Sequence, residues 1–203
     1  NNYIQIGTTI DDAVGEAFDK TSKILNLGYP GGPHVEKFAK LGDKNSYNLP
    51  EPIINRAGCN LSLAGLKTAV LRKSKEISSK KEKYNLAASF QETINKILSK
   101  KTKVAMEKFR DETSSNSLMP FVIAGGVAAN ETIRKNLKQL SIRMNFDPIF
   151  PSKEFCSDNA AMIAWAGIQR FNKKLFTDKS ENVRSRWPLD NNAPFLKGSG
   201  LKL

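Results

Sequence analysis

The sequence predicts an α/β fold in which short buried strands alternate with amphipathic helices. The apolar run 121–124 is followed by two glycines and then by a polar, helix-compatible run, 131–140. The run 145–150 is followed by a stretch rich in small residues, 156–170, that also suits a helix. A chain of 203 residues, 39% hydrophobic and 26% charged, is long enough for a substantial core and lies outside the composition of disordered proteins.

The first 40 residues predict a short strand and two helices. Residues 4–6 fit a strand, and residues 11–25 fit an amphipathic helix with acidic residues near its N-terminal end, where the helix dipole favours them. The Tyr-Pro-Gly-Gly-Pro stretch at 29–33 predicts a rigid turn. Its last proline, Pro33, suits the first turn of a helix over 34–40.

Three acidic residues of the first predicted helix are spaced to share one face. Like charges one helical turn apart repel each other by a few tenths of a kcal/mol. The cluster therefore indicates contact with hydroxyl groups, a cation or a basic partner, although solvent exposure also explains it. These residues are Asp12, Glu16 and Asp19.

The middle of the chain predicts a loop followed by a long helical segment. Residues 44–65 are rich in turn-forming residues, and a helix begins at Gly65. Residues 86–110 carry apolar side chains at helical spacing, namely Leu86, Phe90, Ile94, Ile97, Leu98, Val104, Ala105 and Phe109. We therefore expect a helical segment over about 66–113, with a linker at 111–120.

The stretch from Phe121 to Asn130 combines an apolar strand, a glycine pair and a helix start. Gly125 and Gly126 allow a tight turn with no Cβ in the way. The free N–H groups of the following helix can then face an anion such as a phosphate. An ordinary structural turn has the same pattern, and taken alone that interpretation is favoured.

The last predicted strand, 145–150, is weakened by Pro148. The helix after it, 156–170, has Ser157 or Asp158 as its N-cap. A carboxylate at this point could bind a cation or a ribose hydroxyl, or could simply cap the helix. The tail from residue 177 is predicted to be irregular.

Cysteine and histidine usage excludes several kinds of site. Cys59 and Cys156 are too few for a disulfide framework and match no zinc motif, so we expect buried thiols. His34 is the single histidine, which excludes a two-histidine metal site within this sequence.

The formal net charge of +12 favours a polyanionic partner such as nucleic acid. The charge gathers in 72–83 and 96–110, with few aromatic residues between, which indicates phosphate contact rather than base stacking. Solvated lysine-rich helix faces explain it equally well. No apolar run approaches the roughly 18 residues of a membrane span, so no membrane partner is expected.

Five motifs follow one another along the chain, at 10–20, 29–33, 62–68, 124–130 and 156–164. In this order they resemble the motifs of the tRNA N6-adenosine threonylcarbamoyltransferase family, of the bacterial TsaD type. Arg-Ser-Arg-Trp-Pro at 184–188 fits the C-terminal end of that family. The resemblance covers essentially the whole chain.

The resemblance implies an actin/Hsp70/sugar-kinase-like fold with two α/β lobes around a nucleotide cleft. Residues 1–203 would be the C-terminal portion of one transferase domain, without its N-terminal lobe. The implied reaction moves a threonylcarbamoyl group from threonylcarbamoyl-AMP to N6 of adenosine 37 in tRNAs that read codons starting with A. Asp19 and Gly32 would bind the ribose and adenine region, and Glu36 would assist. Asn130 would contact the same nucleoside.

The resemblance also implies a divalent metal ion, iron in preference to zinc or magnesium, with Asp158 as one ligand. The family's other ligands, a His-x-x-x-His pair, are not in this sequence. One carboxylate holds a transition metal poorly, so we expect this polypeptide alone to be inactive. The implied partners are tRNA, a paralogous TsaB-like subunit and a TsaE-like ATPase, in the cytoplasm or, for an organellar relative, the mitochondrion.

Two other functions fit parts of the pattern. Glycine turns and a cleft carboxylate also serve ATP-dependent kinases and carbamoyltransferases of the same fold that act on small molecules. A non-catalytic module could bind tRNA or another subunit through its basic helices.

Overall fold

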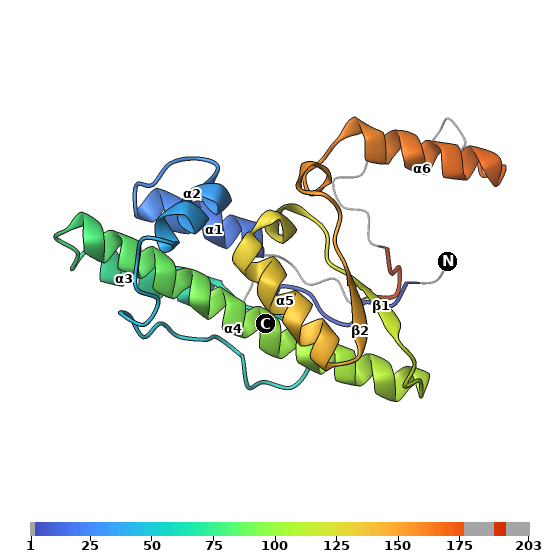
Figure 1. Cartoon of the computed structure of the whole chain (residues 1–203), viewed down its shortest axis with the longest axis horizontal. Coiled ribbons are helices and arrows are strands. Elements are labelled where there is room, and N and C mark those ends of the chain that lie inside the picture. Colours follow the sequence, from blue (N-terminus) through green and yellow to red (C-terminus); the bar gives the residue numbers. More distant parts are fainter. Residues whose placement is uncertain (1–2, 177–188, 194–203) are drawn as a thin grey trace.

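The computed structural model describes residues 3–176 and 189–193 (Figure 1). Helices α1 to α5 pack together, β1 and β2 form a small sheet beside them, and α6 extends away from the rest (Figure 1). In chain order the elements are α1 (Val14–Ile24), α2 (Gly31–Ala39), α3 (Ala64–Ser74), α4 (Lys80–Thr113), β1 (Met119–Val122), η1 (Gly126–Ala129), α5 (Glu131–Arg143), β2 (Phe146–Ile149), η2 (Lys153–Phe155) and α6 (Ala160–Asn172).

The core forms along α4, against which α2, α3 and α5 pack. The α4 side chains Leu86, Phe90 and Ile94 are fully buried, at the spacing of one helix face. Phe90 meets Phe18 of α1 edge to face, with ring centroids 5.2 Å apart. Each such side chain stabilises the fold by roughly 1.5–3 kcal/mol when buried. The apolar stripe predicted for this helix is confirmed as its core-facing side.

The sheet consists of two parallel strands joined through α5, in the register Met119 to Phe146 and Val122 to Ile149. Parallel strands need a crossover of this kind, and here it is a helix. Phe146 is buried, and Phe121 lies with its ring centroid 6.4 Å away. On the opposite face, Val122 and Ile149 are 62% and 43% exposed. One face of the sheet therefore belongs to the core and the other is open.

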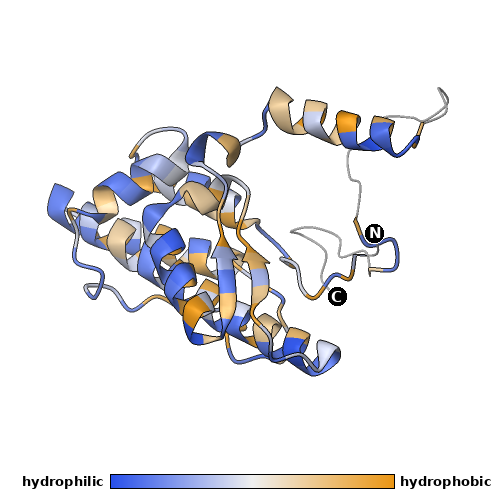
Figure 2. Cartoon of the chain, turned by 45° about the vertical axis from the view of Figure 1, so that its right-hand side comes forward, coloured by the Kyte–Doolittle hydropathy of each residue, from blue (hydrophilic) through white to orange (hydrophobic). Residues whose placement is uncertain are grey.

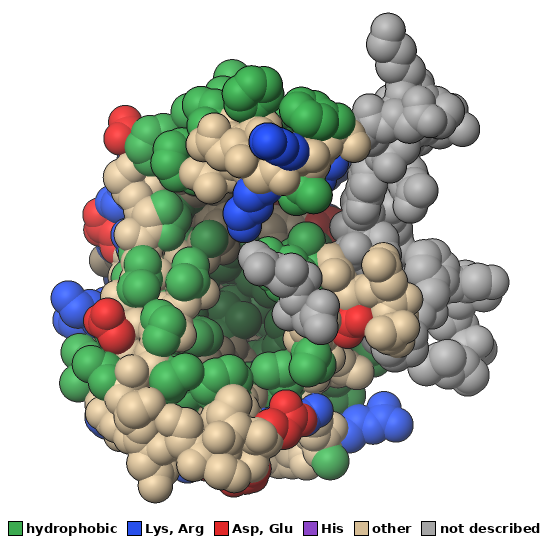
Figure 3. Space-filling view, turned by 90° about the vertical axis from the view of Figure 1, so that its right-hand side faces the viewer, with side chains coloured by type: hydrophobic (Ala, Val, Ile, Leu, Met, Phe, Trp, Pro, Cys, Tyr) green, Lys and Arg blue, Asp and Glu red, His purple; other side chains and the backbone are tan. Residues whose placement is uncertain are grey.

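Helix α6 contributes nothing to the core, because none of its residues is buried. Figure 2 shows hydrophobic residues along it. Figure 3 shows hydrophobic side chains gathered around a hollow on this side of the molecule. The large exposed side chains of α6 are Met162, Ile163, Trp165, Ile168 and Phe171.

The predicted helices are confirmed. Some of them begin at other residues than predicted, because capping interactions set the first residue of a helix. Helix α2 begins at Gly31, three residues early, and Pro33 lies in its first turn as expected. Helix α4 begins at Lys80 rather than near residue 86, because Ser79 and Glu82 form a capping box. Helix α6 begins at Ala160, and its N-cap is Asn159, so the prediction of Ser157 or Asp158 was wrong.

The predicted strands differ more from the structure than the predicted helices do. Residues 4–6 form no strand; near them a single parallel bridge joins Thr9 and Leu61. The Gln5 N–H donates to the Asp190 carboxylate at 2.8 Å, and no backbone of the described residues pairs with 4–6 as a neighbouring strand would. Strand β1 starts at Met119, two residues early, and α4 runs to Thr113, so the linker predicted at 111–120 is shortened to 114–118. The 184–188 motif lies outside the described residues. No helix in the described part of the chain combines the length and apolar character needed to cross a bilayer.

Candidate functional site

The junction of α1 and α2 brings two of the predicted site residues together. The Asp19 Oδ1 atom accepts a hydrogen bond from the Gly31 N–H at 2.7 Å. A Cβ on Gly31 would lie 2.4 Å from the Asp19 Cα, so glycine is required for this close approach. Asp19 therefore holds the first residue of α2 against α1.

Gly32, the next residue, has the opposite environment. A Cβ built on it would meet nothing within 4 Å. Its N–H belongs to the first turn of α2, where backbone donors have no acceptor within the helix. The backbone at Gly32 is thus open to a ligand, as the predicted contact with the adenylate requires.

Glu36 lies one helical turn beyond Gly32 and connects α2 to α5. Its Oε1 atom accepts a hydrogen bond from the Glu131 N–H, the first residue of α5, at 2.9 Å. The Glu131 carboxylate in turn pairs with Lys153 and, at 3.3 Å, with Lys40. Hydrogen bonds from these two lysines hold the pKa of Glu131 below its usual value. The start of α5 is therefore held from two sides.

Asn130 lies directly before α5, in a buried position. Its Oδ1 atom accepts from the Ile133 N–H at 3.0 Å, which caps the helix. Its Nδ2 group donates to Oε1 of Gln91, on α4, at 2.8 Å. The residue predicted to contact the nucleoside is thus also a structural link between α4 and α5.

The glycine pair forms the expected turn. Gly125 has φ +87°, which favours glycine, and Gly126 begins η1. A Cβ on either glycine would meet nothing within 4 Å, so this backbone is open as well. Val127 of η1 lies near Gly15 of α1, since a Cβ there would be 3.9 Å away. The turn, the start of α5 and α1 therefore adjoin one another.

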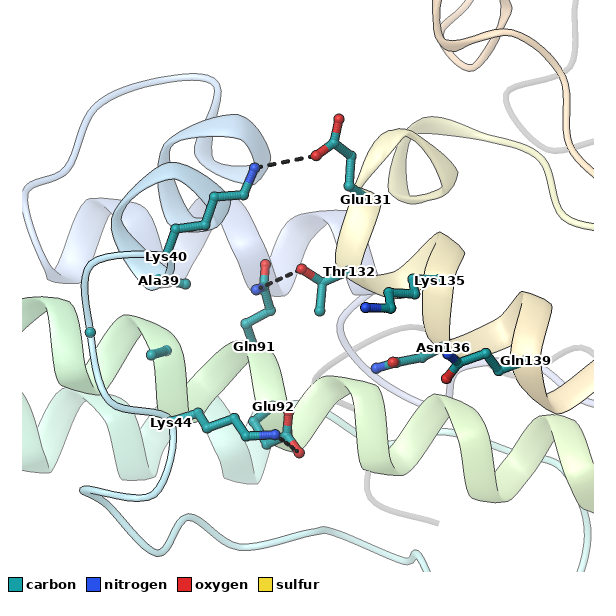
Figure 4. Close-up of a pocket in the computed structure, with 12 residues that line it drawn as sticks. Ala39, Lys40, Lys44, Gln91, Glu92, Glu131, Thr132, Lys135, Asn136 and Gln139 are labelled. Atoms are coloured by element: carbon teal, nitrogen blue, oxygen red, sulfur yellow. Dashed lines mark hydrogen bonds and ion pairs between the residues drawn. The ribbon is translucent and has the colours of Figure 1, made fainter.

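A groove of about 640 Å³ lies next to this site, between α2, α4 and α5 (Figure 4). Polar side chains from these helices line it, and the Gln91 Nε2 group reaches the Thr132 Oγ1 atom at 3.4 Å. Lysines and glutamates lie along it together, in the pairs Lys40 with Glu131 and Lys44 with Glu92.

The three acidic residues predicted to share one face of the first helix do not all lie on it, because α1 begins at Val14 and Asp12 precedes it. Asp12 and Glu16 are paired with lysines of this chain. Asp12 has no exposed side chain and pairs with Lys20 at 2.8 Å and Lys67 at 3.1 Å, while Glu16 pairs with Lys20 at 2.7 Å. Burial raises the pKa of Asp12, but hydrogen bonds from the two lysines outweigh it and the net pKa is lowered. The solvent interpretation is therefore wrong for Asp12. The basic partner belongs to this chain.

Asp158 is exposed and lies before the cap of α6, apart from the other four predicted residues. Within the described ranges, no three His, Cys, Asp or Glu residues gather as a metal site would require. One carboxylate supplies too few ligands for a metal such as iron or zinc. The residues described here therefore do not by themselves fit a metal ion.

The histidine and cysteines have structural surroundings. The His34 ring lies against Gly28 and stacks on Phe38, with centroids 6.5 Å apart. Both cysteines are free thiols; Cys156 is buried, and burial raises the pKa of Cys59. A raised pKa is the opposite of what a reactive cysteine nucleophile needs, so Cys59 has a structural environment.

Several basic residues counted toward the net charge are used inside the fold. Lys101 is buried and donates to the carbonyl oxygens of Arg56 and Gly58, at 2.7 and 3.1 Å. Arg110 donates to the carbonyl oxygens of Ser115 and Asn145. Some of the positively charged side chains therefore hold loops in place and do not face a polyanion.

Sequence reasoning overlooked two residues that organise the site. Gln91 occupies the buried stripe of α4, and a polar residue at such a position was the available signal. Arg134 donates to the carbonyl oxygens of Ala128 and Pro151, and thereby joins η1 to the segment after β2. Nothing in the local pattern around Arg134 distinguished it from a surface arginine.

Residues 1–165 match the family model described as "TsaD: tRNA N6-adenosine threonylcarbamoyltransferase". This chain belongs to the TsaD family. A TsaD relative of that name from Pelagibacter ubique is 55% identical over 202 residues, which cover 100% of this chain and 56% of the relative. Relatives from Rickettsia rickettsii and Zymomonas mobilis are 48% and 45% identical, over 93% and 98% of this chain. The chain thus spans little more than half the length of these TsaD relatives, 54–56%.

Proposed function

We propose that this chain forms the nucleotide-facing C-terminal portion of a tRNA N6-adenosine threonylcarbamoyltransferase with an actin/Hsp70/sugar-kinase-like fold. The complete enzyme transfers the threonylcarbamoyl group of threonylcarbamoyl-AMP to N6 of adenosine 37 in tRNAs that read codons starting with A. Membership of the TsaD family and the names of its relatives support this proposal.

The chemistry is an acyl transfer. The N6 amine of adenosine attacks the carbamoyl carbon, the bond from that carbon to the phosphate oxygen breaks, AMP leaves, and N6 loses one proton. The contribution of this chain is to bind and orient the adenylate, which lowers the entropic part of the barrier. Asp19, Gly32, Glu36 and Asn130 perform this binding.

The observation that carries the proposal is the convergence of these four residues from three segments. Asp19 holds the start of α2, Glu36 holds the start of α5, and Asn130 caps α5. The open backbone of Gly32 and of the glycine turn lies in the same region. The glycine turn, and the N–H groups in the first turns of α2 and α5 that Asp19, Glu36 and Asn130 leave free, are donors suited to a phosphate and to ribose hydroxyls.

Asp158 supplies one ligand to a divalent metal ion in the complete enzyme, with iron favoured. The remaining ligands come from outside the residues described here. Such an ion would supply Lewis-acid chemistry to the reaction. A TsaB-like subunit and a TsaE-like ATPase assist the enzyme in the cytoplasm.

A chimera tests the proposal in a complete protein. This chain replaces the matched 202 residues of the Pelagibacter ubique relative, and the chimera receives threonylcarbamoyl-AMP, tRNA and the two partner proteins. We expect threonylcarbamoyladenosine in the digested tRNA, detected by mass spectrometry, and none from the chain alone.

Asp19→Ala in the chimera should lower kcat/KM by about tenfold or more, the usual cost of removing a charged hydrogen bond. Glu107→Ala, on the exposed side of α4, is the matched control. A chimera that phosphorylates a small hydroxylated substrate without tRNA, and forms no modified adenosine, would instead identify a kinase.

A further inference from the structure

Gln91 is one of several polar residues buried along α4, together with Ser89, Thr93 and Asn95. Its side chain is 6% exposed, beside the fully buried Phe90 and Ile94. Burying a side-chain amide without hydrogen-bond partners lowers the stability of a protein by roughly 1–3 kcal/mol. Gln91 has two partners, and both belong to the start of α5, namely Asn130 and Thr132.

The orientation of these amides is determined by the backbone. The Ile133 N–H can only donate, so the atom of Asn130 that faces it is Oδ1, at 3.0 Å. The Nδ2 group of Asn130 is thereby turned toward Gln91, whose Oε1 accepts at 2.8 Å. The Gln91 Nε2 group is then left to face the Thr132 hydroxyl. Each group has the polarity that its neighbour requires.

This arrangement uses only part of the hydrogen-bonding capacity of the Asn130 side chain. Its amide has two N–H protons and two acceptor lone pairs on Oδ1. One proton goes to Gln91 and one lone pair to Ile133. Within the described part of the chain no other group bonds to this amide, so one donor and one acceptor remain, which match the hydroxyl groups of a ribose or the polar edge of a base.

We propose that Gln91 is a positioning residue, which holds the Asn130 amide so that its remaining N–H and lone pair face the bound nucleoside. The inference rests on the proposed function, because Asn130 is the residue through which Gln91 acts. Gln91 touches no substrate, so its replacement affects binding and leaves the chemical step largely unchanged.

Variants of the chimera test this assignment by steady-state kinetics. Gln91→Met keeps the size of the side chain and removes the acceptor, and we expect KM for threonylcarbamoyl-AMP to rise about tenfold while kcat stays within about twofold. Gln91→Glu keeps an oxygen for Asn130 and should restore KM to within about threefold of the unsubstituted value. Gln139→Met, on the exposed face of α5 in the same groove, is the control and should change neither.

A double-mutant cycle separates positioning from a general effect on the fold. In the Asn130→Ala background, Gln91→Met should cause no further rise in KM. An equal rise in both backgrounds overturns the inference and leaves the proposed function intact. If Asn130→Ala alone left KM unchanged, Asn130 would not contact the nucleoside, and Gln91 could not act through it. A chimera that forms no threonylcarbamoyladenosine overturns the proposed function itself.

A spectroscopic measurement needs no variant that alters folding. In the isotope-labelled chimera, addition of AMP should shift one Nδ2 proton of Asn130, the free one. The proton bound to Gln91 should remain in place. Equal shifts of both protons, or of neither, contradict the assignment.

Discussion

At the scale of single residues, the candidate site depends on two adjacent glycines with different tasks. Gly31 has no room for a Cβ, since it packs against the backbone of α1 at Asp19. A Cβ on Gly32 would meet nothing within 4 Å, so packing does not require glycine there. A glycine at such a position allows a ligand to approach its backbone closely.

Alanine substitutions distinguish the two glycines. Gly31→Ala should destabilise the protein by about 1–3 kcal/mol, because the backbone of α1 must move. Gly32→Ala should leave stability unchanged or raise it by up to about 1 kcal/mol, because alanine favours helices. Its affinity for AMP should nevertheless fall. Urea unfolding and calorimetric titration of the chimera measure both effects, and unchanged AMP affinity in Gly32→Ala would exclude a ligand at that backbone.

At the scale of elements, α4 serves as the support for the site. It carries Gln91 toward α5, and it buries Lys101 beneath a loop. Its first turn is closed by a capping box, in which Glu82 accepts from the Ser78 and Ser79 N–H groups at 3.0 and 2.9 Å. These hydrogen bonds, that of Ser78 foremost, lower the pKa of Glu82 from its ordinary value of 4.5.

The capping box predicts a pH dependence of stability. Because the pKa of Glu82 is lower in the folded chain, its contribution is present above about pH 4.5 and is lost as the pH falls through the folded pKa. Glu82→Gln should therefore lower the urea midpoint at pH 7, with a deficit that shrinks below pH 4.5. Glu107→Gln, on the same helix outside the box, is the control. A deficit independent of pH would show that the charge of Glu82 has no part in the cap.

At the scale of the whole molecule, the most prominent feature is the exposed apolar side of α6 together with the open face of the sheet. Exposed apolar surfaces of this kind mark interfaces. Parallel sheets in α/β proteins are normally covered on both faces. The TsaD relatives are longer than the region they share with this chain. We predict that their additional residues cover this surface.

Trp165, which is 63% exposed, reports on this surface. With Trp187→Phe to remove the second tryptophan, the chain alone should show the emission of a water-exposed indole that acrylamide quenches readily. In the chimera the emission should shift to the blue and quenching should weaken, since apolar surface is removed from water. Identical spectra in the two proteins would mean that α6 stays uncovered.

The basic charge of the molecule predicts binding to tRNA phosphates through the start of α4. Lys80→Glu with Lys81→Glu should weaken tRNA binding by the chimera and reduce the slope of log affinity against log salt by about 0.7–0.9 for each phosphate that is no longer neutralised. Lys23→Glu with Lys37→Glu changes the net charge equally and is the control. If the two double variants had equal slopes of log affinity against log salt, the lysines at the start of α4 would act only through the net charge and not through direct phosphate contacts.

The sequence by itself determined the α/β class, the helices and the order of the family motifs, because periodicity, caps and glycine pairs are local signals. Only the tertiary structure decided what those residues contact. Asp12 meets Lys67, Glu36 meets Glu131, and Asn130 meets Gln91, across separations that no periodic pattern encodes. The predicted strand 4–6 was wrong for a related reason, since a strand exists only beside another strand, and here Gln5 bonds to the Asp190 side chain. The orientation of the Gln91 amide depends on Asn130 at the start of α5, far away in the chain, and only folding brings these two residues together.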